Sequence, residues 1–137
     1  MATADIPTII DFSIFNQLLE MDDDETDREF SHSIVLNFFE QAETTFTKMD
    51  EALAHKDLKE LSSLGHFLKG SSAALGLTLV KDTCEKIQHL GAGKDAAGDN
   101  DISDPTLALS QISPLLITVR HDYAESEKAL RKFYDSQ

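Results

Sequence analysis

His66 and Lys69 stand three residues apart in the sequence HFLKGSS, which begins at His66. Residues at this spacing are neighbours on a helix surface, so the ammonium group of Lys69 can neutralise an anion carried by the imidazole of His66. A neutral imidazole is a nucleophile, and a phosphoryl group is the obvious anion for such a pair. The two residues are therefore candidates for phosphohistidine chemistry.

The residues around His66 leave room for another protein to come close. On a regular helix, His66 points about 140° away from Leu61 and the apolar stripe to which Leu61 belongs. Its neighbours along the helix are too small to shield an imidazole: Ser62, Gly70 and Ala73. Glycine inside a helix costs about 1 kcal/mol relative to alanine, and such violations gather at functional or tightly packed sites. Taken alone, however, this geometry favours a solvated histidine without a function.

These side chains require helices, and the hydrophobic periodicity predicts several of them. Apolar residues recur at steps of three and four residues, the spacing of one buried helix face. The pattern predicts helices over residues 29–54, 57–75 and 79–90, a shorter helix within 9–19, and a last helix that ends near Phe133. The Gly- and Asp-rich residues 91–104 are expected to form a long, mobile connection.

The helix ends are predicted from residues that commonly cap helices. Gly76 and Gly91 are expected to end the helices over 57–75 and 79–90, and Thr78 is a candidate N-cap of the latter. Ser113–Pro114 is typical of a helix start and predicts where the last helix begins. Asp104–Pro105 is expected to start a short helix before it.

Four long amphipathic helices that each need a covered face predict an all-α fold, an antiparallel four-helix bundle with a short additional N-terminal helix. Three prolines, six glycines and the lack of strongly alternating segments leave little material for strands. With 137 residues, of which 41% are hydrophobic, the chain is expected to form one domain over residues 1–137.

The charge balance bears on the choice of partner. The chain has 25 acidic and 12 basic residues, a formal net charge of −13, which repels nucleic acid and anionic lipid. We therefore expect neither nucleic acid nor a membrane as a partner. A single cysteine, no signal-like N-terminus and no apolar run of 18 residues favour a soluble intracellular protein.

Other chemistries fit the residues less well. Cys84 lies on an apolar stripe, which predicts a small buried residue rather than an enzymatic nucleophile. The acidic run over 22–27 lacks the glycine and distal glutamate of a calcium loop and is expected to be a solvated connector. The remaining histidines lack a paired spacing for zinc and are expected to be surface or capping residues: His32, His55, His89 and His121.

Two segments, 66–77 (HFLKGSSAALGL) and 84–91 (CEKIQHLG), strongly resemble the fungal histidine-containing phosphotransfer (HPt) proteins of the Ypd type. The similarity extends to Ile9–Ile10, 21–24 (MDDD) and 38–42 (FFEQA), so it covers most of the chain. It implies a helical bundle that accepts a phosphoryl group from a receiver-domain aspartate on a histidine. The group then passes to the aspartate of another receiver domain, that of a response regulator.

The resemblance also implies a role for individual residues. His66 matches the phosphoacceptor, Lys69 the basic residue that stabilises the phosphoryl group, and Gly70 the small residue that lets a receiver approach. Gln88 matches a glutamine on the neighbouring helix that hydrogen-bonds one ring nitrogen and leaves the other nucleophilic. Glu85, one turn before Gln88, is expected to position Lys69.

Five apolar residues match positions at which the family builds a receiver-docking patch: Ile14, Leu18, Met21, Phe30 and Ile34. Packing of the short N-terminal helix onto the helix over 29–54 is an equally good interpretation of each. Ser71 is expected to give local support at the partner surface, and Ser72 to be buried. Asp82 and Ala92 stand where some relatives carry an aromatic residue and an arginine, which leaves partner choice open.

The implied partners are the receiver domain of a hybrid sensor histidine kinase and downstream response regulators. The resemblance implies a monomer in cytoplasm and nucleus, without a cofactor of its own, and Mg²⁺ on the partner receiver. Because the order Lys69-Gly70-Ser71 is wrong for a phosphate-binding loop, autonomous ATP-dependent kinase activity is not expected. The alternative is an adaptor that binds receivers without passing phosphate, and phosphate transfer separates the two.

Overall fold

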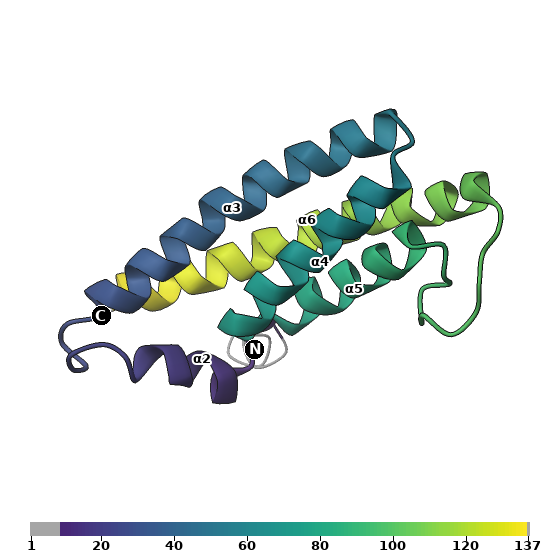
Figure 1. Ribbon diagram of the computed structural model, residues 1–137. Coiled ribbons are helices and arrows are strands. Elements are labelled where there is room, and N and C mark those ends of the chain that lie inside the picture. The colour runs from purple at the N-terminus through teal and green to yellow at the C-terminus, as the bar shows by residue number, and fades with distance from the viewer. Residues whose placement is uncertain (1–8, 137) are drawn as a thin grey trace.

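The computed structural model describes residues 9–136, in which five helices follow one another. They are α2 (Phe12–Leu19), α3 (Glu29–Ala54), α4 (Leu58–Leu75), α5 (Thr78–Gly91) and α6 (Pro105–Asp135). Successive helices from α3 to α6 run in opposite directions, and α2 lies at the end of the bundle where α3 begins and α6 ends (Figure 1). The predicted helical bundle with a short N-terminal helix is confirmed.

The core is formed by the apolar stripe of each long helix. The α4 stripe predicted from the sequence is buried, with Leu61 and Leu68 fully inaccessible. At the α2 end, the ring of Phe15 makes edge contacts with Phe133 at 5.5 Å and Tyr134 at 6.4 Å between centroids. Burial of a large apolar side chain contributes roughly 1.5–3 kcal/mol, so these contacts hold α2 onto the bundle.

Gly76 ends α4, as the sequence predicts, and also joins α4 to α2. Its φ of +77° is left-handed, a conformation that glycine adopts without the steric penalty of a Cβ atom. The backbone N–H of Asp11 donates to the carbonyl of Gly76 at 2.7 Å. Asp11 in turn caps α2, because its carboxylate accepts from the N–H of Ser13.

The predicted start of the last helix at Ser113–Pro114 is wrong. α6 begins at Pro105, where the carboxylate of Asp104 accepts a hydrogen bond from the N–H of Thr106 at 3.0 Å, and it continues through Pro114. An interior proline costs a helix about 3 kcal/mol. The buried side chains Ala108 and Ile112 extend the apolar stripe upstream of Pro114, so packing in the bundle outweighs this cost.

Both predicted ends of the helix over 79–90, which is α5, also need correction. Thr78 is the first helical residue of α5, and Leu77 occupies the N-cap without a side-chain hydrogen bond. Leu77 is fully buried, so packing rather than capping places this helix start. Gly91 is the last residue of α5 instead of the residue after it, and it is buried against α4.

The acidic run over residues 22–27 is not uniformly solvated. Asp22 is buried, and both of its carboxylate oxygens accept hydrogen bonds from Ser31. The other residues of the run that were expected to be solvated, residues 23–27, are exposed. Residues 1–8, on which the expectation of no targeting segment partly rests, lie outside the described residues.

Candidate functional site

His66 lies on the outer face of α4 and is exposed, as the helix geometry predicts. One turn further along, Lys69 is half-buried, and its Nζ lies 3.5 Å from Oε2 of Glu85 on α5. The expected contact between Glu85 and Lys69 is therefore present. A partly exposed ion pair of this kind contributes at most about 1 kcal/mol to stability, and it restricts where the ammonium group of Lys69 can lie.

Gln88 lies on α5, opposite the α4 turn that contains Gly65 and His66. Its backbone carbonyl accepts a hydrogen bond from Oγ of Ser62 at 2.9 Å, which fixes the register of the two helices. The side-chain oxygen Oε1 of Gln88 is buried and has no hydrogen-bond partner. A buried acceptor without a partner costs about 1–3 kcal/mol and suggests a functional role. The hydrogen bond from Gln88 to His66 stays a prediction, with Oε1 as an available acceptor.

Gly65 and Gly91 allow the backbones of α4 and α5 to touch. A Cβ atom on Gly65 would lie 2.9 Å from the carbonyl oxygen of Cys84 and 3.0 Å from the amide nitrogen of Gln88. A Cβ atom on Gly91 would lie 2.6 Å from the amide nitrogen of Ser62. The close approach brings Gln88 and Glu85 beside the face that carries His66. The sequence predicts Gly91 only as the end of a helix, and this packing role was missed, although two glycines in neighbouring helices could have indicated it.

Gly70 differs from these two glycines because it faces open space. Apart from its chain neighbours and the adjacent backbone of α4, no atom lies within 4 Å of the position that its Cβ would occupy, so packing against other elements does not explain this residue. The predicted role in close approach by a partner agrees with this free surface. Ser71 is half-buried and donates to the carbonyl of Phe67, while Ser72 is buried as predicted.

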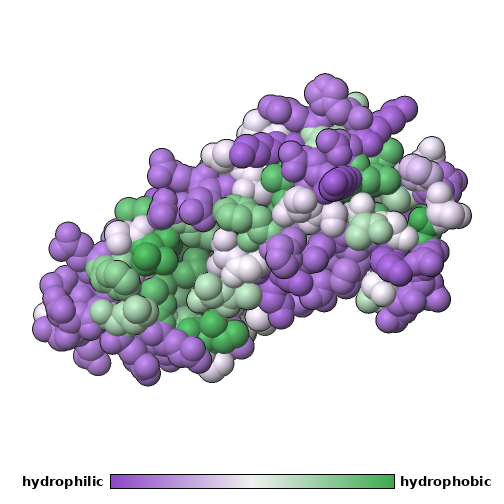
Figure 2. All heavy atoms as spheres, in the orientation of Figure 1, coloured by the Kyte–Doolittle hydropathy of each residue, from purple (hydrophilic) through white to green (hydrophobic). Residues whose placement is uncertain are grey.

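The five apolar residues proposed for docking fall into two groups. Ile14 and Leu18 are half-buried, and Leu18 packs against the core, so packing explains Leu18. The expected partner was wrong, however, because α2 packs mainly on α4 rather than on the helix over 29–54. Met21, Phe30 and Ile34 are exposed by 64%, 45% and 39%, so burial in the bundle does not explain them. We call these three residues the apolar patch. Figure 2 shows apolar side chains gathered at the end of the bundle where α2 lies beside the start of α3.

Phe67 is a further candidate residue that the sequence reasoning did not select. It directly follows His66 and has 48% of its surface exposed, although phenylalanine is usually buried. An aromatic residue at an outward helix position directly after His66 was the available signal. Phe67 adds exposed apolar surface to α4, about 100° around the helix from His66.

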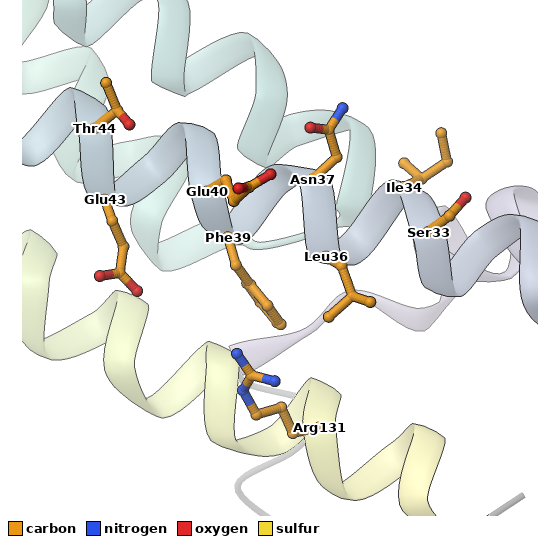
Figure 3. Close-up of a pocket in the computed structure, with 9 residues that line it drawn as sticks. All are labelled: Ser33, Ile34, Leu36, Asn37, Phe39, Glu40, Glu43, Thr44 and Arg131. Carbon is orange, nitrogen blue, oxygen red and sulfur yellow. The ribbon is translucent and has the colours of Figure 1, made fainter.

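A separate groove of about 900 Å³ lies between α3 and α6, away from α4. Figure 3 shows Leu36, Phe39 and Glu43 of α3 pointing toward Arg131 of α6. The guanidinium group of Arg131 lies 4.7 Å from the ring centroid of Phe39 and is bonded to Glu127 at 2.8 Å. These contacts satisfy the cation within the chain, and the groove contains none of the predicted reacting residues.

Cys84 is fully buried on α5, as its place on the apolar stripe predicts. Burial raises the pKa of its thiol to about 12. The reactive thiolate is therefore scarce at neutral pH, which agrees with a packing role.

Two of the other histidines have more specific contacts than the sequence suggests. The ring of His32 is half-buried and stacks on Tyr134 at 4.4 Å between centroids. Nδ1 of His89 donates to the carbonyl of Ala96 at 2.9 Å and thereby ties α5 to the following loop. Within residues 9–136, no group of three or more His, Cys, Asp or Glu side chains could hold a metal ion. Over the same range, no helix has the length and apolar character needed to cross a membrane.

Comparison with known proteins places this geometry among phosphotransfer domains. The family model described as the Hpt domain matches residues 33–129. The multistep phosphorelay regulator 1 of Schizosaccharomyces pombe is 51% identical over 127 residues, which are 93% of this chain and 43% of that protein. The phosphorelay intermediate protein YPD1 of Saccharomyces cerevisiae is 51% identical over 84 residues, which are 61% of this chain and 49% of that protein. The chain thus matches about half or less of the length of these curated relatives.

Solved structures extend the similarity to the whole bundle. The crystal structure of yeast Ypd1p has a TM-score of 0.80 and 33% identity, and the match covers 93% of this chain and 95% of that one. A co-crystal structure of Saccharomyces cerevisiae Ypd1 with the receiver domain of its downstream response regulator Ssk1 matches with a TM-score of 0.79 and 36% identity, at the same coverage. The predicted similarity to the Ypd type is confirmed.

Proposed function

Because this chain belongs to the Hpt domain family, we propose that it is a phosphorelay intermediate that accepts a phosphoryl group on His66 from a receiver-domain aspartate and passes it to another receiver. One observation carries the proposal. An exposed histidine stands beside a lysine held by Glu85 and faces open space at Gly70, on the fold of a protein crystallised with a receiver domain. The arrangement offers a nucleophile and a cation on a surface that another protein can reach.

The proposed transfer is an in-line displacement. A ring nitrogen of His66 attacks the phosphorus of the aspartyl phosphate, a nitrogen–phosphorus bond forms, and the bond from phosphorus to the aspartate oxygen breaks. The aspartate leaves as a carboxylate. Lys69 lies close enough to His66 along the helix to offset charge on the phosphoryl oxygens.

Gln88 has a separate part in the proposal. Its buried Oε1 would accept the N–H of the ring nitrogen that does not attack, which fixes the tautomer and keeps a lone pair on the attacking nitrogen. The chain needs no cofactor of its own in this scheme, because Mg²⁺ bound to the receiver balances most of the transition-state charge. The scheme likewise needs no ATP-dependent kinase activity from this chain.

The partners we propose are the receiver domain of a hybrid sensor kinase upstream and response regulators downstream. The Ypd1 complex with the Ssk1 receiver supports a receiver as the type of partner. We further propose that the protein acts as a monomer in both cytoplasm and nucleus, since a relay from a membrane-associated kinase to a nuclear regulator needs a carrier between them.

Transfer of radiolabelled phosphate from a phosphorylated receiver domain to the purified protein tests the proposal. We expect rapid labelling that is lost in acid and stable in alkali, as for a phosphohistidine. The His66→Gln variant should keep its fold and lose all labelling, because the side chain is exposed. His121→Gln is the matched control, since His121 is an exposed histidine on α6, and it should label like the unmodified chain.

The possible outcomes separate phosphotransfer from the adaptor alternative. Receiver binding without labelling would contradict phosphotransfer and support an adaptor. Acid-labile labelling of His66→Gln would contradict the choice of acceptor. The direction of transfer can be measured by mixing the labelled protein with the unlabelled donor receiver or with a second receiver. Label that appears on both receivers would show that transfer runs in both directions.

A further inference from the structure

The connection between α2 and α3 contains a buried carboxylate that the proposed transfer does not use. The side chain of Asp22 is inaccessible to solvent, and its Oδ2 lies 3.7 Å from Nη1 of Arg28. Oδ1 accepts from the N–H of Ser31 at 2.7 Å, and Oδ2 accepts from Oγ of Ser31 at 2.6 Å. Burying a carboxylate is expensive unless it is paired and hydrogen-bonded, and Asp22 has both kinds of partner.

Asp22 also completes the start of α3. Arg28 occupies the N-cap of this helix and offers no capping side chain to the first turn. The carboxylate of Asp22 takes that place from outside the helix, because it binds the N–H of Ser31 near the positive end of the helix dipole. The connection and the first turn of α3 are thus fixed to each other.

Tyr134 extends this network to the far end of the chain. Its hydroxyl donates to Oγ of Ser31 at 2.8 Å, and Ser31 donates in turn to Asp22. Burial raises the pKa of Tyr134, so the hydroxyl keeps the proton that it donates. The ring of His32 stacks on Tyr134 with the two planes 8° apart, which fixes the position of the hydroxyl.

The network is placed where it can control the apolar patch. Met21 directly precedes Asp22, and Phe30 directly precedes Ser31, so each of these two hydrogen-bonded residues follows an exposed apolar residue. Met21 and Phe30 line one shallow hollow together. The Asp22–Ser31 hydrogen bonds therefore tie together the backbone positions from which Met21 and Phe30 project, although no member of the network lies on α4 or α5.

We propose that Asp22, Ser31 and Tyr134 are positioning residues for receiver docking, which hold Met21 and Phe30 in one binding surface and leave the reactivity of His66 unchanged. This inference rests on the proposed function, because it assumes that the partner is a receiver domain. It assigns docking to a hydrogen-bonded network and the reaction to the separate α4–α5 pair.

The experiment compares two tyrosines of α6. Tyr134→Phe removes the hydroxyl that bonds Ser31, whereas Tyr123→Phe removes a buried hydroxyl that donates to the carbonyl of Phe39 at 3.4 Å, away from the patch. Each variant is mixed with a phosphorylated receiver over a range of receiver concentrations, and the single-turnover rate of transfer is measured. KM here is the receiver concentration that gives half the maximal rate, and kcat is that maximal rate. In parallel, phosphoramidate, a small phosphoryl donor that needs no docking, is used to label His66.

We expect Tyr134→Phe to raise KM for the receiver by about threefold to tenfold, the worth of one hydrogen bond, with kcat and phosphoramidate labelling unchanged. Asp22→Asn removes the charge and should raise KM further. Tyr123→Phe should change neither reaction. Thermal unfolding of each variant shows whether it is folded at the assay temperature.

An unchanged KM in folded Tyr134→Phe and Asp22→Asn would overturn the inference. Equal losses in the receiver and phosphoramidate reactions would also overturn it, because they would indicate general destabilisation. If the unmodified protein is labelled by phosphoramidate but by no receiver, the proposed function itself fails, and this inference falls with it. Failure of the variants alone leaves the proposed function intact.

Discussion

The α4–α5 pair and the α2–α3 junction both face the surface at which we propose that a receiver docks, but they are held in different ways. In the α4–α5 pair, Gly65 and Gly91 bring backbone against backbone with no space for a further carbon atom. At the α2–α3 junction, the buried carboxylate of Asp22 binds Ser31 through hydrogen bonds. The helix that carries His66 is thus held by steric packing, and the Met21 and Phe30 part of the apolar patch is held by polar contacts.

The difference has consequences for how each region responds to substitution. An atom added at either glycine overlaps the neighbouring helix backbone and forces α4 and α5 apart, which lowers the stability of the bundle. A hydrogen-bonded junction can lose one bond for about 1 kcal/mol while the helices remain packed. We therefore expect substitutions of the glycines packed between α4 and α5 to change stability, and substitutions in the α2–α3 junction to change affinity for the partner.

Gly76→Ala should have the largest effect, because this residue joins the two regions. Its φ is +77°, and a Cβ atom would lie 2.5 Å from the carbonyl oxygen of Asp11. Strain and overlap together should lower the free energy of unfolding by about 2–4 kcal/mol, as measured by urea denaturation.

Gly93→Ala is the control for conformation alone. Gly93 has a similar φ of +83°, but the nearest atom to its Cβ position is 3.7 Å away. This variant should lose only about 1–2 kcal/mol, the strain of the left-handed conformation. Equal losses in the two variants would show that contact with Asp11 is unimportant.

Gly65→Ala and Gly70→Ala should change stability in opposite directions. The added methyl group of Gly65→Ala meets backbone atoms of α5 at 2.9 Å and should lower the free energy of unfolding by about 1–3 kcal/mol. At Gly70 the methyl group enters open space, and the helix should gain up to about 1 kcal/mol. Denaturant titration of both variants measures this contrast. Destabilisation by Gly70→Ala would contradict the free surface assigned to that residue.

A bulkier residue at Gly70 tests whether this position matters for docking of the partner rather than for stability. Gly70→Gln should slow receiver-dependent transfer far more than it changes the melting temperature, because its side chain occupies the space left for the partner. Unchanged transfer to this variant would contradict the role of close approach.

The burial of the Cys84 thiol on α5 should make the free energy of unfolding depend on pH. Burial raises its pKa from the ordinary value of 9.0 to about 12, so the folded chain keeps the proton where the unfolded chain loses it. This contribution to stability is fully present below pH 9 and is lost as the pH rises toward 12, by about 1.4 kcal/mol per unit. Denaturation of Cys84→Ser across this range is the control, and an identical pH dependence in both chains would contradict the assignment to Cys84.

Lys69→Ala should have the smallest effect on stability and a clear effect on transfer. The ion pair with Glu85 is partly exposed, so its loss should change the free energy of unfolding by less than about 1 kcal/mol. Transfer to His66 should slow, because the cation next to the phosphoryl group is lost. Glu85→Ala keeps the cation and should slow transfer less, and equal rates in the two variants would contradict a positioning role for Glu85.

Most of the helices could be predicted from the sequence, and the helix ends that were predicted wrongly share one cause. The span of α3 was predicted as residues 29–54 and observed as Glu29–Ala54, because its stripe repeats for seven turns without interruption. The start of α6 was placed at Ser113–Pro114, where a local capping pattern outweighed the buried residues upstream. Local patterns predict where a helix can begin, whereas the packing of distant residues decides where it does begin.

The candidate site divides in the same way. The sequence alone determined that His66 points away from the apolar stripe with Lys69 beside it, because a helix of 3.6 residues per turn fixes these directions locally. Only the tertiary structure decided that Gly91 packs on α4 and that Asp22 is buried, and it shows the contact of Glu85 with Lys69 that was expected only from the family resemblance. Each of these contacts joins residues at least nine positions apart, and their spacing in the sequence carries no information on whether they meet.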